Sequence, residues 1–140
     1  VDTIKKQIAT ARKVNRFAVY TGKNYFYRLT LTDEDYLKSL LPEASDSYLG
    51  LDVTVLNKLI LEDLFNVSEE EYIERVTYTK SLTQAIGELK KGTHQCVVCM
   101  NPVKAEQIRE VVTEGEKMPA RSICVFPKPA SGVIINKFDS

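Results

Sequence analysis

The first third of the chain shows two different spacings of apolar residues. Residues 3–14 place isoleucine, alanine and valine at helical spacing and predict an amphipathic helix. Phe17 and Val19 then alternate with small or polar neighbours, and residues 25–31 repeat that alternation after a turn at 21–24, which predicts a β-hairpin. We expect the alternating aromatic residues of the second strand to face the core rather than to stack on nucleic-acid bases.

The middle of the chain changes to helical spacing. Residues 33–41 predict a short helix that ends at a proline, and residues 42–50 predict a polar loop. The strongest helical pattern covers residues 52–65, where apolar side chains recur every three or four positions and polar ones fill the opposite side. Asp52 stands at the start of this helix, and we interpret it as the N-cap.

Two capping-box patterns follow. Ser68 with Glu71 opens one short turn, after which residues 73–79 are expected to be extended. Ser81 with Gln84 opens another helix, and a Lys-Lys-Gly sequence ends it with positive charge at its negative pole.

The last part of the chain predicts three strands and a helix. Residues 94–100 form a short apolar strand, and residues 101–115 form a helix with Asn as its N-cap and Pro in its first position. Two further strands are expected at 122–126 and 132–138. About six strands and five helices in this order predict an α/β (α+β) fold, a single layered domain with a mixed sheet.

Length and charge limit the possible partners. The 140 residues suffice for one domain with a core, and we divide them into an N-terminal helix, 1–14, and a C-terminal α/β domain, 15–140. Nineteen basic and nineteen acidic residues cancel, which argues against nucleic acid and membrane surfaces as partners. A chain that starts at Val1 without a signal peptide is expected to be part of a longer cytoplasmic protein, with 1–14 as the tail of an upstream domain or a linker.

Cysteine and histidine chemistry has few residues to use. Three cysteines are an odd number, which indicates reduced thiols in a cytoplasm. Cys96 and Cys99 have CxxC spacing, but in a strand residues i and i+3 lie on opposite faces, so we interpret them as core residues. A zinc site would also need His94 and Cys124. We predict no metal site and no cofactor, and the chain has no Walker or Rossmann glycine pattern.

The segment 117–128 combines cations with prolines. Lys117, Arg121 and Lys128 are close in sequence, and Ser122 adds a hydroxyl beside the middle cation. Because such groups suit a phosphate or a carboxylate, these four residues are a candidate anion-binding site. The alternative is that the prolines keep an edge strand from pairing and that the lysines are solvated.

Motifs along nearly the whole chain resemble one family. The most specific of them are Gly115-Glu-Lys-Met-Pro119, Arg121-Ser122, Phe126-Pro-Lys128 and Ser131-Gly132-Val133. Others are Leu51-Asp52-Val53, Asn101-Pro102, Arg16-Phe17-Ala-Val-Tyr20 and Tyr27-Arg28-Leu29-Thr30. Together they resemble the bacterial and archaeal family called domain of unknown function 1015. The chain departs from that family's common residues, which are Lys at Arg121, Thr at Ile123, aromatics at Cys124 and Val125, and His at Asn57.

The resemblance implies a longer protein whose N-terminal part holds a phosphate-binding segment. We therefore expect a C-terminal, non-catalytic domain of unknown function that packs against that missing N-terminal domain. In this hypothesis Lys117, Arg121, Ser122 and Lys128 contribute to a pocket for a phosphate-containing small molecule. One alternative is a part of a small-molecule kinase or phosphatase in which Asp52 is catalytic, and another is a protein-interaction module.

Overall fold

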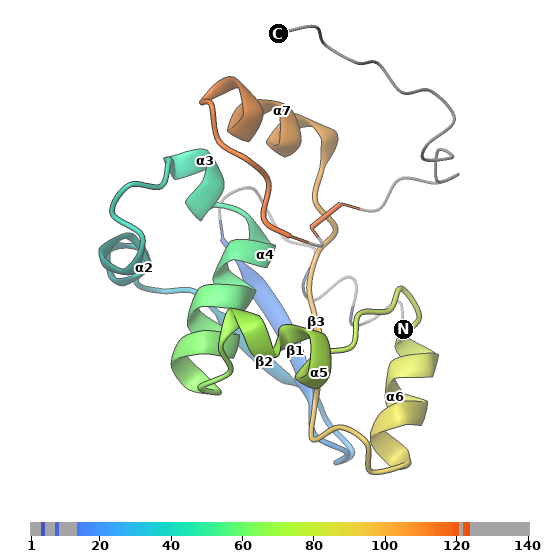
Figure 1. Ribbon diagram of the computed structural model, residues 1–140. Helices are drawn as coiled ribbons and strands as arrows, with labels where there is room; N and C mark the ends of the chain where they lie inside the picture. The colour runs from blue at the N-terminus through green and yellow to red at the C-terminus, as the bar shows by residue number, and fades with distance from the viewer. Residues whose placement is uncertain (1–3, 5–7, 9–13, 121, 124–140) are drawn as a thin grey trace, which may run out of the picture.

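The computed structural model describes residues 14–120, 122 and 123, together with Ile4 and Ile8, which are helical. The elements are β1 (Arg16–Tyr20), β2 (Tyr27–Thr30), α2 (Glu34–Leu40), α3 (Asp46–Leu49), α4 (Asp52–Val55), the π-helix η1 (Leu56–Leu64), the 3₁₀ turn η2 (Glu69–Glu71), α5 (Tyr72–Arg75), α6 (Leu82–Lys90), β3 (Val97–Cys99) and α7 (Ala105–Thr113). Figure 1 shows α3 and α7 at one end of the molecule, and α6 with the β1–β2 turn at the other.

The sheet is smaller than the sequence predicts. In the described part of the chain it has three strands in the order β2-β1-β3, and both pairings are antiparallel. The prediction of a mixed sheet of about six strands is therefore wrong, and the described fold is α+β with more helix than expected. Of the two strands predicted at the C-terminal end, residues 124–126 and 132–138 lie outside the described residues, and the described Ser122 and Ile123 belong to no strand.

The segment predicted to be extended after the first capping box instead continues as helix α5, and its last residues, 76–79, join no strand. The capping box itself is confirmed, because the Ser68 N–H donates to Glu71 Oε2 at 2.9 Å. Glu71 also accepts from Arg75 one turn on, at 2.9 Å, and Tyr72 is buried. These contacts favour a helical turn over an extended strand.

The predicted hairpin is confirmed, but its second strand is exposed. Phe17, Ala18 and Val19 of β1 are buried, and Gly22 allows the turn with φ at +87°. Tyr25 and Tyr27 were expected in the core, yet they are 50% and 42% exposed and pack edge-on against each other, with their hydroxyls 3.0 Å apart. Since β2 is an edge strand of the described sheet, alternation there does not report burial.

The helix predicted at 52–65 is present as α4 followed without a break by η1. Its C-terminal part winds as a π-helix, and the Phe65 N–H donates to the carbonyl of Ile60, five residues back, at 3.0 Å. The N-cap prediction is wrong. Leu51 is the N-cap, without a side-chain bond, and Asp52 is the first residue of the helix.

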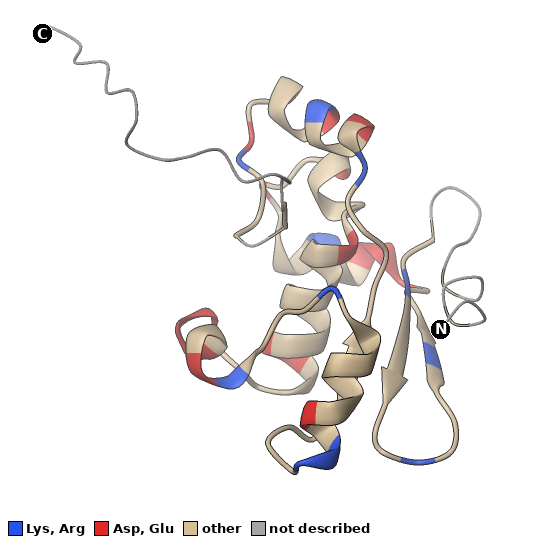
Figure 2. Cartoon of the chain, turned by 90° about the vertical axis from the view of Figure 1, so that its right-hand side faces the viewer, with Lys and Arg blue, Asp and Glu red and all other residues tan. Residues whose placement is uncertain are grey.

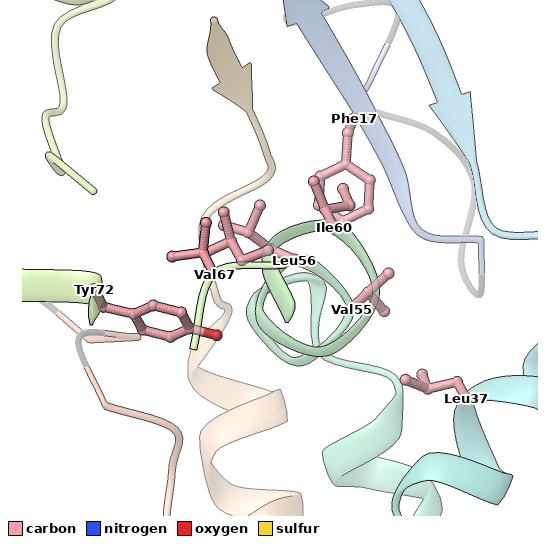
Figure 3. Packing of buried hydrophobic residues seen from close by; sticks show 8 residues of the cluster. Phe17, Leu37, Val55, Leu56, Ile60, Val67 and Tyr72 are labelled. Carbon is pink, nitrogen blue, oxygen red and sulfur yellow. The ribbon is translucent and has the colours of Figure 1, made fainter. Parts of the chain in front are cut away.

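Residues of this helix contribute to two hydrophobic clusters. The larger one joins the sheet, α2, η1 and α5; its buried members are Phe17, Leu37, Val55, Leu56, Ile60, Leu61, Val67 and Tyr72. Figure 3 shows the Tyr72 ring lying against the helix with its hydroxyl end toward it. The smaller cluster consists of Leu51, Val53 and Val111, with Met118 packed against it. It attaches α7 and the segment that follows α7 to the start of α4.

Three further predictions about helices have different outcomes. The Ser81 cap of α6 is confirmed, since the Gln84 N–H donates to its hydroxyl at 3.2 Å. The loop predicted at 42–50 contains α3, which the Ser45 hydroxyl caps. The helix predicted from Asn101 begins only at Ala105, because the Asn101 amide is used elsewhere.

Candidate functional site

Asp52 links three parts of the chain through its carboxylate. Asn15, which precedes β1, donates from Nδ2 to Asp52 Oδ1 at 2.7 Å and also to the carbonyl of Gly50 at 3.0 Å. Asn101, which follows β3, donates to Asp52 Oδ2 from its backbone N–H at 3.1 Å and from Nδ2 at 2.9 Å. Asn15 is buried. We call these three residues the Asp52 cluster. Its carboxylate receives donors on both oxygens, which is the arrangement of a structural cross-link.

A small pocket opens two residues further along the same helix. It lies between η1, α3, η2, α5 and the segment after α7, with a volume of about 50 Å³. It is lined by Tyr48, Thr54, Asn57, Lys58, Glu62, Glu69, Tyr72, Pro119 and Ala120. We call it the Thr54 pocket. Its lining is mostly polar, and three of its polar side chains, Asn57, Lys58 and Glu62, come from the π-helix, a conformation found frequently at functional sites.

Two buried polar atoms in this lining have no partner among the described residues. They are the hydroxyl oxygen Oγ1 of Thr54, a residue that is 2% exposed, and the amide oxygen Oδ1 of Asn57. A buried polar group left unpaired costs about 1–3 kcal/mol. Native folds rarely retain such groups unless water or a ligand fills the space beside them.

The lining also contains a compensated charge pair. The Lys58 ammonium donates to both oxygens of Glu62 at 2.8 Å, and the Tyr72 hydroxyl donates to Glu62 Oε1 at 2.9 Å. Burial, followed by the Glu62 carboxylate, raises the pKa of Tyr72 well above its usual value. Burial likewise raises the pKa of Tyr48. Both phenols therefore stay protonated at neutral pH and serve as neutral hydrogen-bonding groups.

The segment after α7 is held against the pocket by a carboxylate. Glu116 accepts the backbone N–H of Ser45 at 2.8 Å and the Ser45 hydroxyl at 2.7 Å. Pro119 and Ala120 then form one wall of the pocket. The Ser122 hydroxyl donates to the carbonyl of Pro119 at 2.6 Å and closes a turn directly after that wall. The Glu116 bonds thus tie this segment to the start of α3.

The predicted anion-binding residues are described only in part. Lys117 is exposed, and Ser122 is half-buried beside the pocket wall. Arg121 and Lys128 lie outside the described residues. The sequence interpretation did not identify the pocket residues Tyr48, Thr54 and Lys58. Only Asn57 carried a signal, since the resembled family commonly has His at that position.

Other chemistry-bearing side chains contribute no further site. Both nitrogens of His94 contact hydroxyls, those of Thr93 at 2.9 Å and Thr77 at 3.0 Å. Cys96 and Cys99 are free and half-buried, and burial raises the pKa of each thiol. Among the described residues, no three acidic, histidine or cysteine side chains gather as a metal site.

Neither charge nor helix length marks out a particular partner among the described residues. Figure 2 shows basic and acidic residues interspersed over the described elements. None of the described helices has the length and apolar character needed to cross a membrane.

Comparisons with known proteins gave no match: no family model, no curated protein and no solved structure is similar to the chain at the significance required. The resemblance described from the motifs therefore stays a prediction.

Proposed function

We propose that the chain is a non-catalytic domain that binds a small anionic compound at the Thr54 pocket. The observation that carries the proposal is the position of Pro119 and Ala120, which form a wall of the pocket and belong to the cation-bearing segment that the sequence singles out. Arg121 follows Ala120 directly in the sequence. Cations beside a small polar pocket suit a phosphate or carboxylate group.

Three features support binding rather than catalysis. The Asp52 carboxylate is engaged on both oxygens, so it is not available as a general base. The one histidine is bonded at both ring nitrogens to threonine hydroxyls. The described thiols have raised pKa values because of burial, which keeps them protonated and poorly nucleophilic.

The wider setting belongs to the same proposal. The odd number of cysteines supports a cytoplasmic protein. The family resemblance supports a larger protein in which an N-terminal phosphate-binding domain packs beside this one and shares the ligand.

The test is a titration of the 140-residue chain with inorganic phosphate, in which calorimetry measures the affinity and NMR chemical shifts of the pocket amides locate the site. We expect binding that weakens by about tenfold or more in Arg121→Ala/Lys128→Ala, because each charge-assisted hydrogen bond contributes about 1.5–3 kcal/mol. Lys80→Ala/Lys90→Ala removes two exposed cations at and near α6 and is expected to leave the affinity unchanged. Equal affinities of the wild type and the first double variant would contradict the proposal.

A further inference from the structure

The outer edge of β2 carries backbone groups that the described sheet does not use. β2 pairs with β1 on one side, and no strand of the described chain pairs with its other side. The Leu31 N–H donates to the Asn15 carbonyl at 3.0 Å, which sets the phase of the ladder. Bonded pairs alternate with non-bonded pairs in an antiparallel ladder, so the N–H and C=O groups of Arg28 and Thr30 point away from β1. We call these groups the β2 edge.

The chemistry of the β2 edge suits another polypeptide. Its N–H and C=O groups present donors and acceptors in turn, and an added strand offers the complementary order. A phosphate backbone offers acceptors but no donors, so it would leave the carbonyls of the edge unpaired. Arg28 and Thr30 are both exposed, and a strand can therefore reach the edge.

The charge around the β2 edge favours an acidic strand. Residues 14–32 contain no acidic residue, whereas they include the cations Arg16, Lys23 and Arg28 in a chain that is neutral as a whole. The next residue after them, Asp33, uses its carboxylate to cap α2. The ion pairs of the described residues do not include Arg28. Opposite charges across neighbouring strands stabilise a sheet and like charges destabilise it, so a carboxylate is the suitable neighbour for Arg28.

The two faces of β2 favour different side chains on an added strand. Tyr27 and Leu29 share the face that carries Leu29 onto the larger hydrophobic cluster, and the Tyr27 ring is exposed beside Tyr25. Arg28 and Thr30 share the opposite face. Residues that stand opposite each other on paired strands have their side chains on the same face. An added strand therefore places apolar side chains against Tyr27 and Leu29, and acidic ones against Arg28.

We propose that the β2 edge binds an extended segment of a partner protein as an added antiparallel strand, and that this segment alternates acidic and apolar residues. Antiparallel pairing continues the pattern of both pairings in the described sheet. A second copy of the chain does not fit this edge, because its own β2 has the cation Arg28 and no acidic residue. No residue of β2 lines the Thr54 pocket, so this site is separate from the proposed anion site.

The experiment titrates the full 140-residue chain with a labelled peptide of alternating valine and glutamate. The matched control peptide has lysine in place of every glutamate. Fluorescence anisotropy measures the affinities, and we expect the glutamate peptide to bind about tenfold or more tightly than the lysine peptide. NMR hydrogen exchange follows the strand itself. The N–H groups of Arg28 and Thr30 are expected to exchange fast in the free chain and slowly in the complex, whereas that of Leu29 is protected in both.

Methylated peptides test the strand pairing without any change to the chain. In antiparallel pairing the glutamates stand opposite Arg28 and Thr30, so their N–H groups donate to the β2 edge. N-methylation of the glutamates is therefore expected to abolish binding. The valine N–H groups point away from β2, and N-methylation of the valines is expected to preserve it.

A charge reversal connects the peptide preference to Arg28. Arg28→Glu is expected to reverse the preference, so that the lysine peptide binds more tightly than the glutamate peptide. Lys80→Glu changes an exposed cation outside the sheet and is expected to leave the preference unchanged.

Each contrary outcome overturns a stated part of the proposal. Equal binding of the two peptides, absence of binding by both, or an unchanged preference in Arg28→Glu overturns the acidic partner. Binding that survives methylation of the glutamates overturns the added strand. Slow exchange of the Arg28 and Thr30 N–H groups in the free chain shows a different occupant: a second copy if the protection rises with chain concentration, and another segment of this chain if it does not. Tighter binding of a single-stranded oligonucleotide than of the glutamate peptide assigns the cations to nucleic acid instead.

Discussion

Two polar sites lie two residues apart on one helix, and they differ in whether their hydrogen-bonding groups have partners. In the Asp52 cluster, both carboxylate oxygens receive donors, from Asn15 and Asn101. In the Thr54 pocket, a hydroxyl and an amide oxygen are buried without a partner in the described chain. Both sites are enclosed by neighbouring segments of the same fold. The cluster satisfies its own hydrogen bonds, whereas the Thr54 hydroxyl and the Asn57 amide oxygen are buried with unused hydrogen-bonding capacity.

The difference shows which of the two polar residues, Asp52 or Thr54, holds segments of the fold together. A partly buried carboxylate is the residue type that attracts a catalytic interpretation, and Asp52 received one as an alternative from the sequence. Its partners instead show that it joins the start of α4 to the segments before β1 and after β3. Thr54 has an ordinary side chain, and its hydroxyl is buried without a partner among the described residues, which costs stability.

The largest expected effect is from removing the centre of the Asp52 cluster. Asp52→Ala leaves the Asn101 backbone N–H without its acceptor and removes one acceptor from each of the Asn15 and Asn101 side-chain amides, which keep the carbonyls of Gly50 and Ile8. We expect the free energy of unfolding to fall by about 3 kcal/mol. Urea denaturation measures this loss. Asp35→Ala removes an exposed carboxylate from the first turn of α2, and its effect should stay within about 0.5 kcal/mol. Similar losses in both variants would mean that the cluster is not the structural cross-link.

A change at Thr54 is expected to act in the opposite direction. Thr54→Val replaces an unpaired buried hydroxyl with a methyl group of similar size, and we expect the free energy of unfolding to rise by about 1 kcal/mol. The same urea experiment measures it, with Thr83→Val as the exposed counterpart. A decrease of about 1 kcal/mol or more would show that the hydroxyl has a partner, such as a tightly bound water, and the contrast between the two sites would disappear.

The parts of the fold that local pattern determines were predicted from the sequence. The helix at 52–65 and the hairpin turn at Gly22 follow from spacing and from a positive φ that glycine adopts easily. The capping bonds at Ser68 and Ser81 follow from side chains three residues apart. The short helix α3 also has a capping pattern, in which Ser45 is the N-cap and an acidic residue follows it. It was not predicted, because it has too few apolar residues to show helical spacing.

The errors concern partners that are distant in sequence. Asp52 has the residue type of an N-cap, but its oxygens are bound by residues 37 and 49 positions away. Tyr27 has the pattern of a core residue, but it lies on an edge strand. The pocket could not be predicted, because a missing partner for Thr54 is a property of the assembled fold. The sequence marked the segment around Pro119 and Ala120 as unusual, but it did not predict that this segment lines the pocket.

The smallest expected effect concerns an exposed carboxylate that, like Asp52, accepts a backbone N–H. The Ser68 N–H, and then Arg75, hold the pKa of Glu71 below its usual value of 4.5. A lowered folded pKa contributes stability that is present above the unfolded pKa and is lost as the pH falls through the folded one. Glu71→Gln keeps an acceptor for Ser68 but has no charge. We therefore expect the wild type to be slightly more stable than Glu71→Gln at pH 7, and the difference to shrink as the pH falls below the usual value of 4.5 and through the lowered folded pKa, as urea midpoints across that range would show. A difference that grows as the pH falls would mean that the folded state does not stabilise the ionised Glu71 carboxylate.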